Sequence, residues 1–464
     1  MQDTPQSIGM KVPPKMGIRD VADIVGHKYP ISVIDVQHQE ELEGWTLGDL
    51  VEYFEDEERL LRMKQSNHKS SRRQRRTATT TSKLQQPKVL NQISMEFSKT
   101  PLSKYIKSPQ FVRDLDWIDH AWPKGRPHDA PTVQYYCLTS TAGCYTDFHV
   151  DFGGTSVWYH VLEGSKEFIL IEPTDENLRI YEEWLCQSNQ SQVWLCDMMP
   201  ETPVKIQLQE GQTLVIPSGW IHAVYTPRDS LVFGGNFLHG LEIQKQLSIN
   251  NLETRTRVPE KFRFPSYLEL QFYVAGMYLE SMKTGTVCQR EVDGLKTLLY
   301  ALKEWWKLQA SPLMVTAAIG AAKECDCESV EQMIEALEKE RDRILRDGIC
   351  RNPSYRDKPK LKLTTGIASP SMKVESTGFR ITLPSSSLYP MPNRKVSRRE
   401  DIDEFFPVPN EGLEEWKPSK TLTSTASKLA KKKETAALPV AKVKIPIKVK
   451  KSTNSRDRLM KRFR

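Results

Sequence analysis

The chain has 464 residues, a length sufficient for two or three domains. Only 38% of the residues are hydrophobic, and these concentrate between about positions 130 and 310, so we expect one main folded unit with disordered additions. No run of eighteen apolar residues occurs and the first fifteen residues lack an apolar signal core, which argues against a membrane-spanning or secreted protein. The formal net charge is +7, yet residues 427–464 carry fourteen Lys or Arg against two acidic residues, so a slightly acidic body is followed by a basic tail. Such a tail indicates nuclear targeting or contact with nucleic acid, although a merely solubilising role explains it equally well.

The N-terminal quarter combines weak structural signals with a stretch that is too polar to fold. Residues 1–15 are expected to be a disordered leader, residues 31–36 a short strand and residues 46–63 a helix. Thr46 and Asp49 have the spacing of a capping box, and apolar residues then recur at helical intervals. Residues 64–88 are rich in Ser, Thr and Gln and contain four arginines, which predicts a disordered basic insertion that could also serve as a nuclear import signal.

Ordered structure is expected to resume at residues 89–97, and from about residue 133 the pattern changes to short apolar strands separated by turn residues. Such punctuation is typical of an all-β sandwich or barrel. Glycine pairs at 153–154 and 234–235 indicate turns or a close approach of two backbones. The expected strands are 133–138, 156–162, 167–171, 204–208, 213–216, 221–225 and 230–233.

After residue 238 the apolar spacing becomes helical. Helices are expected at 243–254, 267–282, 291–308 and 329–346, packed against the β domain or against one another as an appended bundle. Beyond residue 347 the chain is rich in Pro, Ser and Lys, which predicts a disordered tail. The chain is therefore divided into 1–15 (leader), 16–63 (N-terminal support), 64–88 (basic insertion), 89–240 (β domain), 241–347 (helical region) and 348–464 (basic tail).

The eight cysteines do not suggest a structural metal site. No Cys-x2-Cys pair occurs, and the single Cys325-x-Cys327 has no matching partner pair, so the sequence does not favour a zinc finger. In an intracellular protein these residues are reduced thiols that behave mostly as small hydrophobic side chains.

The motif with the clearest chemical meaning is His149-Val150-Asp151, followed about seventy residues later by His222. Two imidazoles and one carboxylate are the ligand set of a non-haem Fe(II) oxygenase, which occupies one face of the metal and leaves the other face open. On a β-strand, residues i and i+2 point to the same side, so His149 and Asp151 can both face a barrel interior. A hydrogen-bonded pair in a turn is the alternative explanation for these two residues.

The sequence around this motif resembles that of the JmjC-domain histone lysine demethylases. The resemblance is carried by the blocks YTDFHVDFGGTSVWYH at 145–160, GWIHAVYTP at 219–227 and FGGNFLH at 233–239. Within that family it is strongest to the F-box/leucine-rich-repeat branch and its shorter fungal-type relatives, then to the PHD-finger group. It implies a double-stranded β-helix, a jelly-roll or cupin-like barrel, with N-terminal α/β elements and a C-terminal helical bundle. The sequence contains no recognisable PHD finger, CXXC zinc module or leucine-rich repeat.

The resemblance also assigns roles to individual residues. It implies that His149, Asp151 and His222 hold Fe(II), and that Lys166 and Thr146 bind the distal carboxylate of 2-oxoglutarate. An exposed turn lysine is the alternative for Lys166. Further residues of the co-substrate pocket would be Asn91, Tyr159 and Asn236, and Tyr136 matches a position that contacts the methylammonium group, although core packing explains Tyr136 equally well. His160 and His239 receive no role and are expected to be structural.

The implied activity is Fe(II)-, O₂- and 2-oxoglutarate-dependent demethylation of methylated histone H3, by N-methyl hydroxylation with release of formaldehyde. Mono- or dimethylated lysine 36 is the preferred substrate, with lysine 9 or lysine 27 as the alternative. The implied partners are the H3 tail and the nucleosome in the nucleus, with DNA contact through the basic tail. A protein hydroxylase with the same barrel and a non-catalytic chromatin scaffold remain as competing functions.

Overall fold

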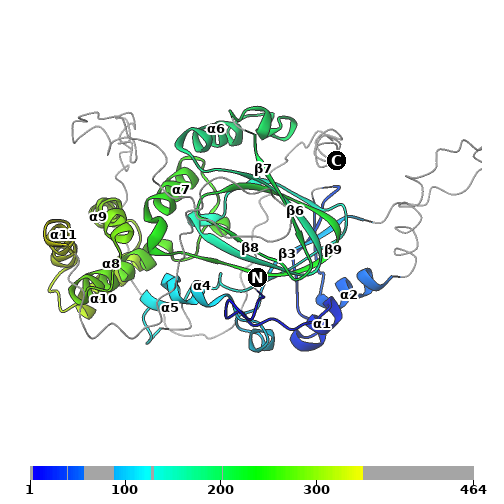
Figure 1. Ribbon diagram of the computed structural model, residues 1–464, viewed down its shortest axis with the longest axis horizontal. Helices are drawn as coiled ribbons and strands as arrows, with labels where there is room; N and C mark the ends of the chain where they lie inside the picture. The colour runs from blue at the N-terminus through cyan, green and yellow to red at the C-terminus, as the bar shows by residue number, and fades with distance from the viewer. Residues whose placement is uncertain (1–3, 39, 57–87, 127–129, 201, 349–464) are drawn as a thin grey trace, which may run out of the picture. The chain divides into compact units, whose positions relative to one another are not determined.

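The computed structural model describes residues 4–38, 40–56, 88–126, 130–200 and 202–348 (Figure 1). The basic insertion and the basic tail expected from the sequence lie outside these residues, apart from residue 88 at the end of the first and residue 348 at the start of the second. In the described chain, nine strands form one antiparallel sheet in the order β2-β1-β3-β4-β9-β6-β7, with β5 paired to β9 and β8 paired to β6. The strands are β1 (Val33–Asp35), β2 (Glu40–Leu42), β3 (Leu90–Glu96), β4 (Tyr136–Ser140), β5 (Tyr145–His149), β6 (Ser156–Ile171), β7 (Val204–Gln209), β8 (Thr213–Ile216) and β9 (Ile221–Phe237).

Two long strands, β6 and β9, replace four of the short strands predicted from the sequence. They pair with each other along nearly their whole length, with three register shifts between Val161 and Glu167. Gly164 lies at this irregularity with φ +88°, and a Cβ there would stand 2.0 Å from the Asp229 carbonyl oxygen. Gly164, which suggested the end of a strand, therefore lies in a β-bulge, an irregularity that bends and twists a strand without ending it.

The alternation along β6 separates an inner core from an outer one. Tyr159 packs with Val157, Phe168 and other residues of one apolar cluster. Trp158 belongs to a second cluster that continues into α1 (Ile18–Val25) and α2 (Leu47–Glu55). Because successive side chains of a strand point to opposite faces, one strand contributes to both cores. The fold class expected from the sequence, a mainly β jelly-roll with added helices, is confirmed.

The N-terminal segment differs from expectation in two respects. Met10 is buried and Lys11 forms a β-bridge with Lys107, so residues 4–15 pack against the folded unit and do not form a disordered leader. The helix capped by Thr46 ends at Glu55 and not near residue 63, because Asp56 leaves the helical conformation with ψ 110°. The cap itself is confirmed: the Thr46 hydroxyl accepts from the Asp49 N–H, and the Thr46 N–H donates to the Asp49 carboxylate at 2.8 Å.

The four helices predicted after the sheet are present, and several further helices were not anticipated. The predicted four are α7 (Ile243–Arg255), α8 (Tyr267–Thr284), α9 (Gln289–Leu308) and α11 (Val330–Asp347); α8 packs against α11 and α10, and α9 against α7 and α11. The unanticipated helices include α4 (Gln110–Leu115), α5 (Trp117–Ala121), α6 (Asp175–Leu185) and α10 (Pro312–Glu324). In Figure 1, α6 and α7 lie along one side of the sheet and α8 to α11 at its end. No helix among the described residues is both long and apolar enough to cross a membrane.

Candidate metal centre

The three side chains of the His-x-Asp…His motif come together in space. His149 ends β5 and His222 lies at the start of β9, where the two residues are register partners. Asp151 lies two residues after His149. One ligand atom from each residue lies within 4.8 Å of the others, and His222 Nε2 is 3.7 Å from Asp151 Oδ2. Among the described residues this is the only group of three or more His, Cys, Asp or Glu with that geometry.

Hydrogen bonds prepare both imidazoles to bind a metal through Nε2. His149 Nδ1 lies 2.9 Å from the Asp147 carbonyl oxygen, and His222 Nδ1 lies 3.0 Å from the Trp220 carbonyl oxygen. A carbonyl only accepts, so each Nδ1 carries the proton and each Nε2 keeps its lone pair. Burial lowers the pKa of His222 to about 4, an effect to which the neighbouring His149 adds. The His222 imidazole is therefore neutral near pH 7, which is the form that ligates metals.

Asp151 is held by a neighbour from the far end of β9. Asn236 is buried, and its Nδ2 lies 3.4 Å from Asp151 Oδ1 and 2.8 Å from Thr155 Oγ1. Asn236, which the sequence placed in the co-substrate pocket, thus contacts a candidate metal ligand directly. Such contacts to a ligating carboxylate fix its orientation.

Lys166 is a buried cation. Its side chain lies in the sheet interior with the residue only 3% exposed, and Nζ donates to Ser140 Oγ at 2.9 Å and to Thr226 Oγ1 at 2.8 Å. The Ser140 hydroxyl in turn donates to Asn91 Oδ1 at 2.9 Å. Burial lowers the pKa of Lys166 to about 8. This burial rules out the alternative of an exposed turn lysine.

The ammonium group of Lys166 has no carboxylate partner within ion-pair distance among the described residues. A buried charge with only neutral hydroxyl partners is costly. An anionic ligand in the barrel would remove that cost. The donor set therefore fits a group that combines a metal-chelating end with a distal carboxylate, as a keto-diacid does.

Three further predicted residues lie around this region. The Tyr159 ring is buried and stands edge-on to Phe168 at 5.2 Å, and Phe168 is 6.3 Å from the His222 ring. Thr146 is exposed on β5 opposite Val224. Tyr136 on β4 is half-buried, and burial, followed by the charges of Glu96 and Asp151, raises its pKa.

Two residues that contact Lys166 were missed by the sequence interpretation. Ser140 ends β4 and Thr226 lies within β9, and neither belongs to a motif that marks a function. Their role appears only when β4, β6 and β9 are brought together. The expected structural histidines do have hydrogen-bond partners: His160 lies 2.9 Å from Thr213 Oγ1, and His239 lies 2.9 Å from Ser156 Oγ.

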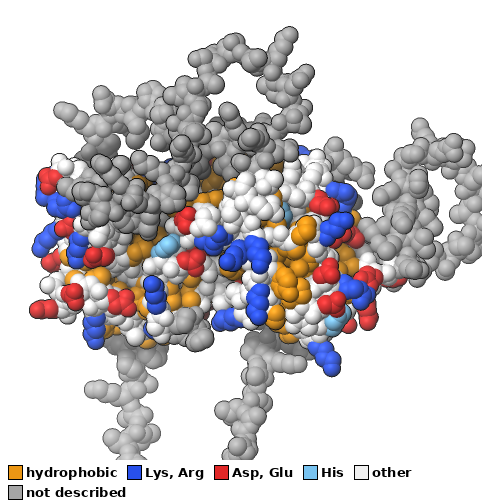
Figure 2. All heavy atoms as spheres, turned by 60° about the horizontal axis from the view of Figure 1, so that its bottom comes forward, with side chains coloured by type: hydrophobic (Ala, Val, Ile, Leu, Met, Phe, Trp, Pro, Cys, Tyr) orange, Lys and Arg blue, Asp and Glu red, His pale blue; other side chains and the backbone are white. Residues whose placement is uncertain are grey.

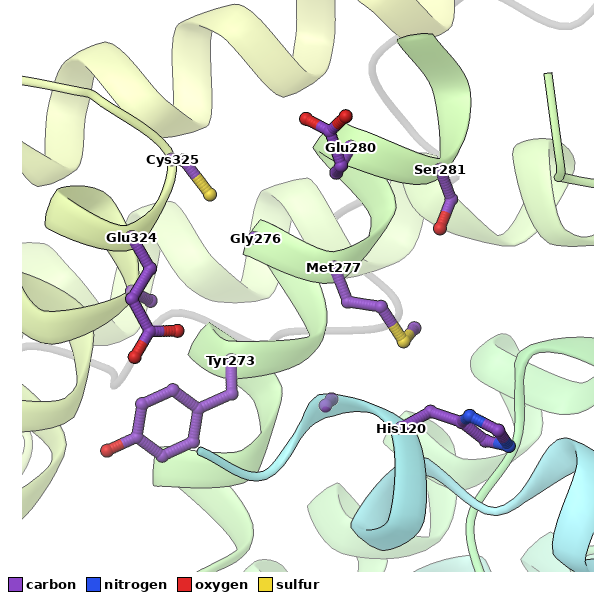
Figure 3. A pocket seen from close by; sticks show the side chains of 10 residues that line it. His120, Tyr273, Gly276, Met277, Glu280, Ser281, Glu324 and Cys325 are labelled. Carbon is purple, nitrogen blue, oxygen red and sulfur yellow. The ribbon is translucent and has the colours of Figure 1, made fainter. Parts of the chain in front are cut away.

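A hollow of about 400 Å³ lies apart from these groups, between α5, α8 and α10 (Figure 3). Tyr273, Met277 and Glu280 of α8 face it together with Glu324 and Cys325 at the end of α10. None of its lining residues is a candidate metal ligand or a partner of Lys166. The hollow is therefore not part of the candidate metal centre.

Comparisons with known proteins agree with this geometry. The family model of a cupin-like domain matches residues 20–239, and that of a Jumonji helical domain matches residues 241–342. Lysine-specific demethylase 2A of Xenopus tropicalis is 44% identical over 290 residues, which are 60% of this chain and 23% of that protein. Lysine-specific demethylase 7A of Danio rerio is 39% identical over 304 residues, 64% of this chain and 31% of that protein. Histone lysine demethylase PHF8 of Danio rerio is 38% identical over 309 residues, 65% of this chain and 27% of that protein.

The chain thus spans less than a third of the length of these curated relatives. The matched region nevertheless contains both domains in sequence, together with the His-Asp-His group and the buried lysine. The chain thus contains a cupin-like domain followed by a Jumonji helical domain, and over this region it is similar to lysine-specific demethylases.

Proposed function

We propose that the protein is an Fe(II)- and 2-oxoglutarate-dependent demethylase of methylated lysine in histone H3. One observation carries this proposal: three ligand atoms of His149, Asp151 and His222 converge in the same barrel in which Lys166 is buried without an anionic partner. A metal site alone would fit many proteins. A metal site together with a buried cation fits a chelating dicarboxylate.

The chain's own residues would bind and orient the reactants. The two imidazoles present Nε2, and Asn236 fixes the carboxylate of Asp151. Lys166 would receive the distal carboxylate of 2-oxoglutarate, with the exposed Thr146 hydroxyl as a second donor. Tyr159 and Asn91 would line the pocket. Fe(II) held by His149, Asp151 and His222 would supply the oxidising power together with 2-oxoglutarate and O₂: one oxygen atom would go into succinate with loss of CO₂, and the other into the N-methyl group, which would leave as formaldehyde.

The substrate that we prefer is mono- or dimethylated lysine 36, with lysine 9 or lysine 27 as the alternative. This preference is supported by the sequence resemblance to the F-box/leucine-rich-repeat branch. The identities to the three relatives differ by only a few per cent and do not distinguish between these lysines. Tyr136 is the residue that we propose for contact with the methylammonium group, and its ring is half-buried. Aromatic faces attract cations.

Two other functions use the same residues differently. A protein hydroxylase would share every proposed metal and co-substrate residue and would add one oxygen to a protein without removing methyl groups. A non-catalytic chromatin scaffold would not need the metal centre at all. The complete His-Asp-His group and the buried Lys166 favour an enzyme over a scaffold.

We propose the nucleosome as partner and the nucleus as location. Positive side chains gather near the middle of the face drawn in Figure 2, with acidic and hydrophobic side chains on both sides. These charges belong to the folded unit and are separate from the basic tail predicted from the sequence. Basic groups of either kind would contact DNA phosphates without reading base sequence.

A panel of H3 peptides, each methylated at one lysine, tests the proposal by mass spectrometry with Fe(II) and 2-oxoglutarate supplied. We expect the lysine 36 peptide to lose about 14 Da, the mass of CH₂, for each methyl group removed, with release of formaldehyde. The His149→Ala variant should show no turnover. A gain of one oxygen on a protein without any demethylation would select the hydroxylase. Turnover that survives His149→Ala unchanged would refute the metal assignment.

A further inference from the structure

The turn that carries Asp151, residues 150–155, is held from two sides by helices. Tyr181 of α6 is buried, and its phenol lies beside the backbone of Val150. On the other side of Asp151, Glu253 of α7 accepts a hydrogen bond of 2.8 Å from the N–H of Gly153. Asp151 lies between these two contacts, so a shift of the turn would move a candidate metal ligand.

The same turn lies directly against the helical region. Gly153 and Gly154 have φ of +61° and +65°, a conformation that favours glycine. A Cβ on Gly153 would stand 3.0 Å from Phe264 Cβ, and one on Gly154 would stand 2.8 Å from the Cα of Gln246. A Cβ on Gly153 would also stand 3.2 Å from Cε2 of Tyr267, the first residue of α8, so the packing of α7 and of the start of α8 holds the turn in place.

Glu253 is an unfavourable residue for packing alone. It is 6% exposed, forms no ion pair among the described residues, and its Oε2 has no hydrogen-bond partner there. Arg263 donates to the backbone oxygen of Glu253 at 2.6 Å, and no ion pair joins it to the Glu253 carboxylate among the described residues. Burial raises the pKa of Glu253 to about 7. An apolar side chain of similar size would fill this place at lower cost, so the bond to Gly153 is what distinguishes a glutamate here.

We propose that Glu253 is a positioning residue of the metal centre: it fixes the Asp151 turn through the Gly153 amide and thereby sets the direction of the Asp151 carboxylate. This inference rests on the proposed function, because it takes His149, Asp151 and His222 as ligands of Fe(II). Its consequence is that the Jumonji helical domain, which contributes α7, completes the metal centre of the cupin-like domain.

The test compares metal affinity with stability in the full chain. Mn(II) replaces Fe(II) because it is not oxidised in air, and its dissociation constant is measured by electron paramagnetic resonance. Glu253→Met keeps the volume and removes the acceptor, whereas Glu253→Gln keeps an acceptor for the Gly153 N–H. Tyr278→Phe is the matched control, because it removes a hydrogen bond to Glu291 within the helical region without touching the turn. Thermal unfolding of the metal-free proteins is the second measurement.

We expect Glu253→Met to weaken Mn(II) binding by about tenfold or more, as is usual for partners that orient a metal ligand, while its Tm stays equal or rises. Glu253→Gln should bind within about threefold of the wild type. Tyr278→Phe should lose stability and keep its affinity. Wild-type affinity in Glu253→Met, or equal weakening in both Glu253 variants, would overturn the inference.

Two outcomes complete the design. If Glu253→Met does not fold, Glu253→Leu takes its place, because leucine also lacks an acceptor for the Gly153 N–H; weakened Mn(II) binding in that variant supports the positioning role, and wild-type affinity contradicts it. If the wild-type protein itself does not bind Mn(II), the metal assignment fails and the positioning role fails with it. The wild-type measurement alone therefore distinguishes a failure of the positioning role from a failure of the metal assignment.

Discussion

Replacing Lys166 with methionine should separate co-substrate binding from folding. Removing one partner of a buried, hydrogen-bonded charge pair costs roughly 2–5 kcal/mol, and each 1.4 kcal/mol or so is a factor of ten in affinity. The affinity for 2-oxoglutarate should therefore fall at least about twentyfold. The free energy of unfolding of the unliganded protein should rise. The lowering of the Lys166 pKa from 10.5 to about 8 corresponds to about 3 kcal/mol of disfavoured charge in the folded protein.

Isothermal titration of 2-oxoglutarate into the Mn(II)-loaded protein measures the affinity, and thermal unfolding of the unliganded protein measures the stability. Lys205→Met is the control, because Lys205 lies on the neighbouring strand β7 with its ammonium 2.9 Å from Glu167 and its side chain 47% exposed. That variant should change neither quantity appreciably. A change in affinity below about threefold in Lys166→Met, with the fold intact, would mean that Lys166 does not anchor the co-substrate.

Three further predictions follow from other features. The affinity for 2-oxoglutarate should fall as pH rises above about 8, approaching about tenfold for each further pH unit, because the free protein loses the Lys166 proton near that value. Titrations between about pH 7 and about pH 9 that show no trend in affinity would contradict the role of Lys166 as the anchor of the co-substrate. Gly235→Ala should prevent correct folding, since a Cβ there would stand 1.8 Å from the Gln134 carbonyl oxygen, and circular dichroism of the purified variant checks this. If residues 427–464 bind DNA phosphates, deleting them should flatten the dependence of nucleosome affinity on salt, and an unchanged slope in a gel-shift series would exclude that contact.

The candidate ligands could be predicted from the sequence because their signal is local. His149 and Asp151 are two residues apart, and His222 stands in a Gly-Trp-Ile-His frame with a strong family resemblance. The Thr46 cap was predictable for the same reason, because a capping box involves residues three positions apart. Helices α7, α8, α9 and α11 followed from apolar spacing alone.

The bent strands and the surroundings of Lys166 could not be predicted in this way. A bulge at Gly164 and a turn have the same local composition, and only the pairing of β6 with β9 tells them apart. Ser140 and Thr226 are ordinary strand residues until three strands bring their hydroxyls to one ammonium group. Helix α10 was missed because its alanine-rich sequence lacks a marked apolar stripe.

Lys166 and Glu253 show the same physical pattern with opposite sign. Each is a buried charge without an ion-pair partner among the described residues, each has a pKa shifted toward the neutral form by burial, and each is bonded to a group of the candidate site. Charges placed in this way lower the stability of the fold, and such local costs are characteristic of functional sites. Lys166→Met and Glu253→Met should therefore both preserve or raise stability while losing different ligands, the first 2-oxoglutarate and the second the metal. Since the two residues are bonded to different groups, their effects on stability should add in the double variant, and a strong departure from additivity would show that the two charges are coupled through the barrel.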